Sequence, residues 1–131
     1  MGKKKKKSGK DRTRFKLKRT DAIRSIVETD NTFKLIDDLW VGKCIHCGTK
    51  LVVVDGTWCT SATIEHIMPI CAGGDDDVRN IALACSNCNS EKGIRHDQKN
   101  LDARAKTIIA KLKAIRLIDR WRDGPDGNIV T

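Results

Sequence analysis

Two C-x-x-C pairs restrict the folds open to this chain more than any other feature. Residues 44–48 read Cys-Ile-His-Cys-Gly and residues 85–88 read Cys-Ser-Asn-Cys, with 37 residues between the two pairs. Four thiolates from two such pairs are the ligand set of a tetrahedral structural zinc site. A redox-active pair normally stands alone, so the repeated spacing favours metal binding. The predicted Zn²⁺ ligands are Cys44, Cys47, Cys85 and Cys88.

The composition indicates why such a chain needs a metal. It has 131 residues, the size of one domain, and aromatic residues make up only 4% of it. Structural zinc contributes on the order of 10–16 kcal/mol in small peptides, which offsets a thin core. The other two cysteines, Cys59 and Cys71, are predicted to be small apolar fillers of the core. His46, inside the first cysteine pair, could replace a cysteine as a zinc ligand, but we predict an exposed loop residue.

The positive charge is concentrated at the N-terminus. Residues 1–20 contain eleven of the 26 Lys and Arg residues and one acidic residue. Such a segment cannot pack, so it is either a solvated leader or an arm that binds polyanions, and both readings stay open. No apolar run approaches the roughly 20 residues of a membrane span, and no apolar segment follows the lysines as in a secretory signal. We therefore expect an intracellular, cytoplasmic protein with no membrane contact.

Apolar periodicity and turn residues give a coarse organisation of the chain. The predicted parts are a disordered basic tail (1–19), an N-terminal helical segment (20–42), a core (43–100), an amphipathic basic helix (101–122) and a loose C-terminus (123–131). Within the core we predict strands at 51–54, 62–68 and 81–84, a flexible connector at 73–77 and a helix from about 86. The last helix carries lysines and arginines between its apolar positions.

An ordered series of residues in the core resembles a known family. The acid–histidine pair Glu65-His66 is followed by a proline, a Gly-Gly loop, Asn80 before a short apolar strand, the second cysteine pair, Asn89 and a Lys-Gly pair. In this order the elements resemble the HNH endonuclease family in its zinc-stabilised form, over about residues 43–95. The sequence departs from the family pattern at Glu65, where Asp is commoner, and at Asn89, where the third letter would be His.

The resemblance implies an α+β fold, in which a small ββα-metal core is stapled by a four-cysteine zinc site and flanked by N-terminal and C-terminal helices. It also implies a nuclease in which His66 is the catalytic base that activates water and Asn80 fixes the loop that orients it. A histidine can do this near neutral pH, typically with a 10²–10⁴-fold effect. Glu65 and Asn89 would hold a catalytic Mg²⁺ or Mn²⁺ through oxygen ligands.

One geometric difficulty accompanies this assignment. Neighbouring side chains on a regular strand point to opposite faces of the sheet. Glu65 and His66 would nevertheless have to serve one phosphate. Either the strand kinks at this point or the substrate straddles the edge of the strand.

DNA contacts are predicted next to the site, at Lys92, Arg95 and Lys99. The basic face of residues 104–122 either extends these contacts or is exposed to solvent without contacting DNA. Because the sequence shows no recognition helix, we expect double-stranded DNA bound with weak sequence preference and strong salt dependence. A partner protein that supplies sequence specificity would also be consistent with this prediction. The alternative function is a non-catalytic zinc-containing DNA-binding module, which would bind DNA and leave it intact.

Overall fold

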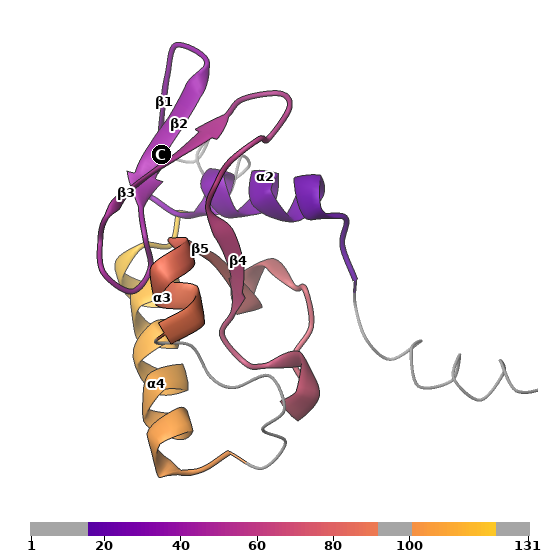
Figure 1. Ribbon diagram of the computed structural model, residues 1–131, viewed down its shortest axis with the longest axis vertical. Coiled ribbons are helices and arrows are strands. Elements are labelled where there is room, and N and C mark those ends of the chain that lie inside the picture. The colour runs from indigo at the N-terminus through magenta and orange to yellow at the C-terminus, as the bar shows by residue number, and fades with distance from the viewer. Residues whose placement is uncertain (1–15, 92–100, 123–131) are drawn as a thin grey trace, which may run out of the picture.

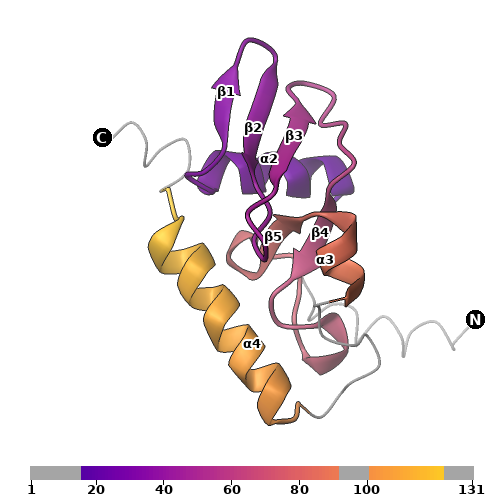
Figure 2. The ribbon, with the colours of Figure 1, turned by 60° about the vertical axis from the view of Figure 1, so that its left-hand side comes forward.

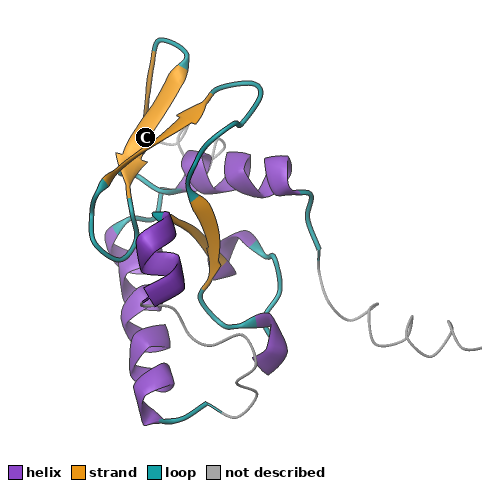
Figure 3. Ribbon diagram, viewed as in Figure 1, coloured by secondary structure: helices purple, strands orange, loops and turns teal. Residues whose placement is uncertain are grey.

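The computed structural model of the chain describes residues 16–91 and 101–122 (Figures 1 and 3). The helices are α2 (Arg19–Thr29), α3 (Ser86–Glu91) and α4 (Ala103–Ala114), and the strands are β1 (Lys34–Ile36), β2 (Leu39–Lys43), β3 (Lys50–Val54), β4 (Thr63–His66) and β5 (Ile81–Ala84). β1–β2–β3 form one antiparallel sheet and β4–β5 form a separate antiparallel hairpin. This mixture of helices and small sheets around one apolar core confirms the predicted α+β class.

Helix α2 forms because its apolar residues recur at helical spacing. Ile23, Ile26 and Val27 are buried on one face, and this face packs against β5. The helix ends at Asp30, whose Oδ1 accepts hydrogen bonds from the backbone N–H and the hydroxyl of Thr32. This local capping turns the chain out of the helix and into the first strand.

The second half of the predicted helical segment 20–42 is a β-hairpin, so that part of the prediction is wrong. The strands β1 and β2 are joined by a two-residue turn in which Asp37 has φ 57°. A short polar side chain tolerates this left-handed conformation better than most residues. Gly42 lies against Phe33, and a Cβ atom at position 42 would come within 2.4 Å of the Phe33 ring. The hairpin can therefore cover the buried ring only with glycine at position 42.

The β4–β5 hairpin carries the acid–histidine pair. Its register is regular, from Thr63 opposite Ala84 to His66 opposite Ile81. The predicted strand 81–84 is confirmed and is buried throughout, whereas the strand predicted at 62–68 is shorter. In the part of the chain that the structure describes, β4 pairs only with β5, so its other edge is open. Figure 2 shows α3 beside this hairpin, and α3 packs against β4.

Helix α4 begins at Asp102, whose Oδ1 accepts a hydrogen bond from the N–H of Ala105 at 2.8 Å. Its apolar positions Ala105, Ile109 and Leu112 are buried, and a π-helical turn extends it over Ile115–Asp119. In Figure 1 it runs along one side of the molecule. Among the helices in the described ranges, none combines the length and the apolar character needed to cross a membrane.

The last arginines of the predicted basic face point into the protein, so the expectation that this face either contacts DNA or lies in solvent is wrong for these residues. Arg116 is fully buried, and its guanidinium donates to the Ile81 carbonyl at 2.8 Å and to the Thr29 hydroxyl at 2.6 Å. Burial lowers the pKa of Arg116 to about 10, so it stays charged at neutral pH. Arg122 donates to the carbonyls of Val27 and Glu28. These arginines therefore satisfy the C-terminal end of α2.

Candidate functional site

The two cysteine pairs meet where the turn between β2 and β3 approaches the start of α3. All four sulfur atoms lie within 4.8 Å of one another. The Cys47 and Cys85 sulfurs are 3.8 Å apart, and four sulfurs bound to one zinc at about 2.3 Å are about 3.8 Å apart. The donor set and its spacing fit structural zinc, as predicted. Four thiolates would close the coordination sphere of a bound zinc, which is the ligand set of a structural site and not of a catalytic one.

The protonation of the cluster depends on its surroundings. The backbone N–H of Cys85 donates to the sulfur of Cys44 at 3.3 Å, which stabilises a thiolate there. Hydrogen bonds from Thr49 lower the pKa of Cys47 to about 6. Burial raises the pKa of the Cys88 thiol to about 12. A metal that binds the cluster must therefore displace the Cys88 proton at neutral pH, and acid will compete with it.

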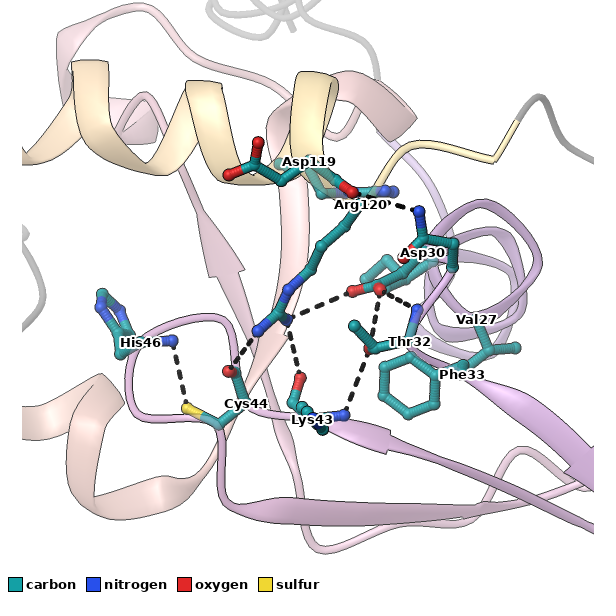
Figure 4. Close-up of polar contacts among 12 residues, drawn as sticks. Val27, Asp30, Thr32, Phe33, Lys43, Cys44, His46, Asp119 and Arg120 are labelled. Atoms are coloured by element: carbon teal, nitrogen blue, oxygen red, sulfur yellow. Dashed lines mark hydrogen bonds and ion pairs between the residues drawn. The ribbon is translucent and has the colours of Figure 1, made fainter.

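Figure 4 shows how the first cysteine pair is tied to the rest of the fold. Arg120 donates to the carbonyls of Lys43 at 3.1 Å and Cys44 at 3.2 Å. The same guanidinium lies 3.7 Å from Asp30 Oδ2. The backbone N–H of His46 donates to the Cys44 sulfur at 3.4 Å. The position of this pair is thus set by α2 and by the C-terminal extension of α4, far away in the sequence.

His66 ends β4 with its side chain 27% exposed. Its Nε2 lies 2.7 Å from Asp76 Oδ1, and the other oxygen of Asp76 accepts a hydrogen bond from the backbone N–H of Leu17. A carboxylate at Nε2 favours the tautomer in which Nε2 carries the proton and Nδ1 is the acceptor. Within residues 16–91 and 101–122, Nδ1 has no hydrogen-bond partner. The ring is therefore held in a form that can take a proton from water.

The loop between β4 and β5 brings Asp76 to this histidine. Asn80 closes the loop, because its Oδ1 accepts from the Met68 N–H at 2.7 Å and its amide donates to the Met68 and Asp75 carbonyls. Gly74 is buried, and a Cβ atom there would lie 1.9 Å from the Met68 carbonyl oxygen. The connector predicted to be flexible at 73–77 is thus held tightly, which corrects that expectation. The prediction rested on the three successive acids, which would repel a substrate backbone, and it did not foresee the three hydrogen bonds that the Asn80 side chain makes.

Glu65 lies on the other face of β4, where it meets His46. Its side chain is 4% exposed, that of His46 is 8% exposed, and Glu65 Oε2 is 3.4 Å from His46 Nε2. The prediction of an exposed His46 is therefore wrong, because the turn that brings the cysteines together also buries this ring. With the regular register of β4, the structure shows no kink between Glu65 and His66. Of the two geometric possibilities, a substrate across the open strand edge fits this arrangement.

Other predicted site residues lie partly or wholly outside the described residues. Asn89 is the fourth residue of α3, and the structure describes only its backbone. Lys92, Arg95 and Lys99 fall in 92–100, outside the described residues. Their roles, and the cation site at Glu65 and Asn89, stay predictions.

Two residues at the site were missed by sequence reasoning, Asp76 and the buried His46. Asp76 belongs to a run of three acids, and nothing in its ten-residue distance from His66 distinguishes it from its neighbours. Asp76 reaches His66 because Asn80 closes the loop. A contact of this kind forms only in the tertiary structure, so no local sequence pattern indicates it. Cys59 is exposed and Cys71 is half-buried, so Cys59 is not the core filler that was predicted.

The chain was compared with known families and proteins. Residues 44–95 match the family model described as HNH endonuclease. The matched segment contains both cysteine pairs, the β4–β5 hairpin and α3. Searches of curated proteins and of solved structures gave no significant match.

Proposed function

Because residues 44–95 match the HNH endonuclease family model and contain a four-cysteine cluster that fits structural zinc, we propose that the protein is a metal-dependent DNA endonuclease or nickase. The observation that carries this proposal is the state of His66. Its ring is fixed at Nε2 by Asp76, is free at Nδ1 among the described residues, and stands half-exposed at the end of an edge strand. A positioned, accessible imidazole is what general-base activation of water requires.

In the proposed reaction, water attacks the phosphorus atom of a phosphodiester bond while His66 Nδ1 accepts a proton from it. The bond between phosphorus and the 3′-oxygen breaks and the 3′-oxygen takes a proton from solvent, which leaves 5′-phosphate and 3′-hydroxyl ends. Asp76 keeps the ring in place and stabilises the imidazolium that forms. A divalent cation, when bound, stabilises the negative charge on the phosphate and on the leaving oxygen.

The proposed ligands of that cation are Glu65 and Asn89. A carboxylate and a side-chain carbonyl are hard oxygen donors that suit Mg²⁺ or Mn²⁺. Support comes from the packing of α3, which carries Asn89, against β4, which carries Glu65. With His66 on the opposite face, the scissile phosphate would lie across the open edge of β4.

The proposed substrate is double-stranded DNA, bound mainly through its phosphates and with weak sequence preference. Lys92, Arg95 and Lys99 directly follow α3 in the sequence and are the proposed contacts. The basic N-terminal tail joins the described fold next to the site, because the N–H of Leu17 donates to Asp76. Attachment at this point supports a tail that binds the same polyanion as the site.

A nicking assay on supercoiled plasmid, with Mg²⁺ or Mn²⁺, tests this function. Wild-type protein is expected to convert the plasmid to its open-circular or linear form, and His66→Ala to lose that activity while it keeps its zinc. Tight DNA binding without cleavage, with either metal, would instead support the non-catalytic DNA-binding module. One observation favours that second function, namely that Glu65 is buried against His46 and faces away from His66.

A further inference from the structure

Two buried polar atoms lack a hydrogen-bond partner in the part of the chain that the structure describes, and they lie on neighbouring side chains. These atoms are His46 Nε2 and Glu65 Oε1. Both side chains are more than nine-tenths buried. A buried polar atom left unpaired costs about 1–3 kcal/mol, and folded proteins rarely tolerate it without a reason. The shared location of the two atoms points to a ligand that both of them contact.

We propose that His46 and Glu65 hold a divalent transition-metal cation together, at a site separate from the thiolate zinc. This deepens the proposed nuclease function, on which it rests, because it adds a nitrogen ligand to the cation that Glu65 is proposed to bind. A site with one imidazole and one carboxylate takes Mn²⁺ or a later first-row cation in preference to Mg²⁺. The metal preference of the enzyme would then be set by a residue of the first cysteine pair.

The distance between the two side chains agrees with shared coordination. His46 Nε2 and Glu65 Oε2 are 3.4 Å apart. Two donors at about 2.1 Å from one cation are about 3.0 Å apart at an octahedral right angle and about 3.4 Å apart at a tetrahedral angle. The same chain shows what a direct histidine–carboxylate hydrogen bond looks like, since His66 Nε2 and Asp76 Oδ1 are 2.7 Å apart. The His46–Glu65 pair is too long for such a bond and of the right length for two ligands.

The surroundings favour a cation at this position. Zinc with four thiolates carries a charge of about −2, and the backbone of His46 is bonded to one of these sulfurs. Glu65 adds a further negative charge when it is ionised. Such a buried carboxylate beside an anionic thiolate cluster requires compensation, which a divalent cation supplies.

A groove gives access to His46 from outside. It has a volume of about 580 Å³ and lies between the first cysteine pair and α4, with His46, Arg104 and Lys111 among its lining residues. Arg104 and Lys111 are exposed cations that attract phosphate oxygens. Oxygen atoms of solvent or phosphate that enter this groove would complete the coordination left open by two protein ligands.

The test is a titration with Mn²⁺, followed by electron paramagnetic resonance, of the full chain loaded with one equivalent of zinc, which the four thiolates bind first. Mn²⁺ lies below zinc in affinity for thiolates, so it leaves the cysteine cluster intact. We expect one bound Mn²⁺ with a hyperfine coupling to a histidine nitrogen, and weaker binding of Mg²⁺ in competition. Replacement of His46 by Gln should remove the nitrogen coupling and weaken Mn²⁺ binding at least about tenfold.

A second variant keeps the proposal falsifiable if His46→Gln does not fold. The chain has three histidines, so the double variant His66→Ala/His96→Ala leaves His46 alone, and it should retain the nitrogen coupling. Loss of the coupling in this variant, equal Mg²⁺ and Mn²⁺ affinities, or no bound Mn²⁺ in wild type would overturn the proposal. If the protein nicks plasmid with Mg²⁺ but shows no histidine coupling, the nuclease function is supported and the His46–Glu65 metal site is rejected. If bound Mn²⁺ shows the histidine coupling but the plasmid stays intact, the metal site is supported and the nuclease function is rejected.

Discussion

The two faces of β4 present the same pair of side-chain types in different states. On one face His66 is half-exposed and lies 2.7 Å from Asp76, which fixes the ring through a direct hydrogen bond. On the other face Glu65 is buried and lies 3.4 Å from His46, with an unpartnered atom on each side chain among the described residues. In the first pair the two side chains are hydrogen-bonded to each other. In the second pair they have the separation expected of two ligands of one metal cation. The proposed base and the proposed cation ligand thus lie on opposite faces of one strand.

The two faces also depend on different supports. His46 belongs to the first cysteine pair, so the Glu65 face relies on zinc and on Arg120. The loop that carries Asp76 relies on hydrogen bonds from Asn80. Each support can be removed separately, and the consequences should differ in kind as well as in size.

Loss of zinc should have the largest effect. In Cys88→Ser, or after chelation, the cysteine cluster loses a contribution on the order of 10–16 kcal/mol, so the fold should be lost. Circular dichroism and zinc content measure this. Acidification should also release zinc, because protons compete for the thiolates and burial raises the pKa of Cys88 to about 12. Cys59→Ser, which changes an exposed cysteine outside the cluster, is the control and should remain folded. A folded, zinc-free Cys88→Ser protein would contradict the structural role.

Replacement of His66 by Ala should reduce plasmid nicking by about 10²–10⁴-fold, because it removes the proposed base. The fold and the zinc content should be unchanged, since the side chain is half-exposed and lies on the face away from the cysteine cluster. Rates are measured under single-turnover conditions with saturating metal. Cleavage at the wild-type rate would rule out this histidine as the base.

Replacement of Asn80 by Ala should open the loop and lower the free energy of unfolding by about 2–3 kcal/mol. The backbone N–H of Met68 and the carbonyls of Met68 and Asp75 would each lose a partly buried hydrogen bond, at a net cost of about 1 kcal/mol for each bond. Urea unfolding of the zinc-loaded protein measures the difference. The neighbouring Arg79→Ala is the control, since Arg79 is exposed and its side chain stacks on Trp121. Equal stability of the two variants would show that Asn80 does not hold the loop.

Asp76→Asn should have the smallest effect, about a tenfold loss in nicking rate, because His66 itself remains. The amide can donate to Nε2 and thereby favours the tautomer with the proton on Nδ1, which cannot accept one from water. Asp75→Asn makes the same charge change in the same loop, where its carboxylate accepts from the Asp77 N–H and not from His66. It should nick at nearly the wild-type rate. If both variants behave alike, charge and not the hydrogen bond explains the loss.

Local spacing along the chain was enough to predict several features. The two C-x-x-C pairs fixed the zinc ligands, because two residues between cysteines let both sulfurs reach one ion. The strand at 81–84 was predicted from its β-forming residues, and helix α4 from its apolar periodicity. Both patterns involve only residues that are close together in the sequence. The charge of the N-terminal tail was also read directly from the sequence.

Contacts between distant segments decided the rest. Asp76 reaches His66 only because Asn80 closes a loop, and His46 meets Glu65 only because zinc-binding turns bring residues 19 positions apart together. Arg116 looked like part of a solvated basic face, yet α2 supplies the carbonyl and hydroxyl that draw it inside. A side chain's partner depends on the packing energy of the whole fold, which no single segment contains.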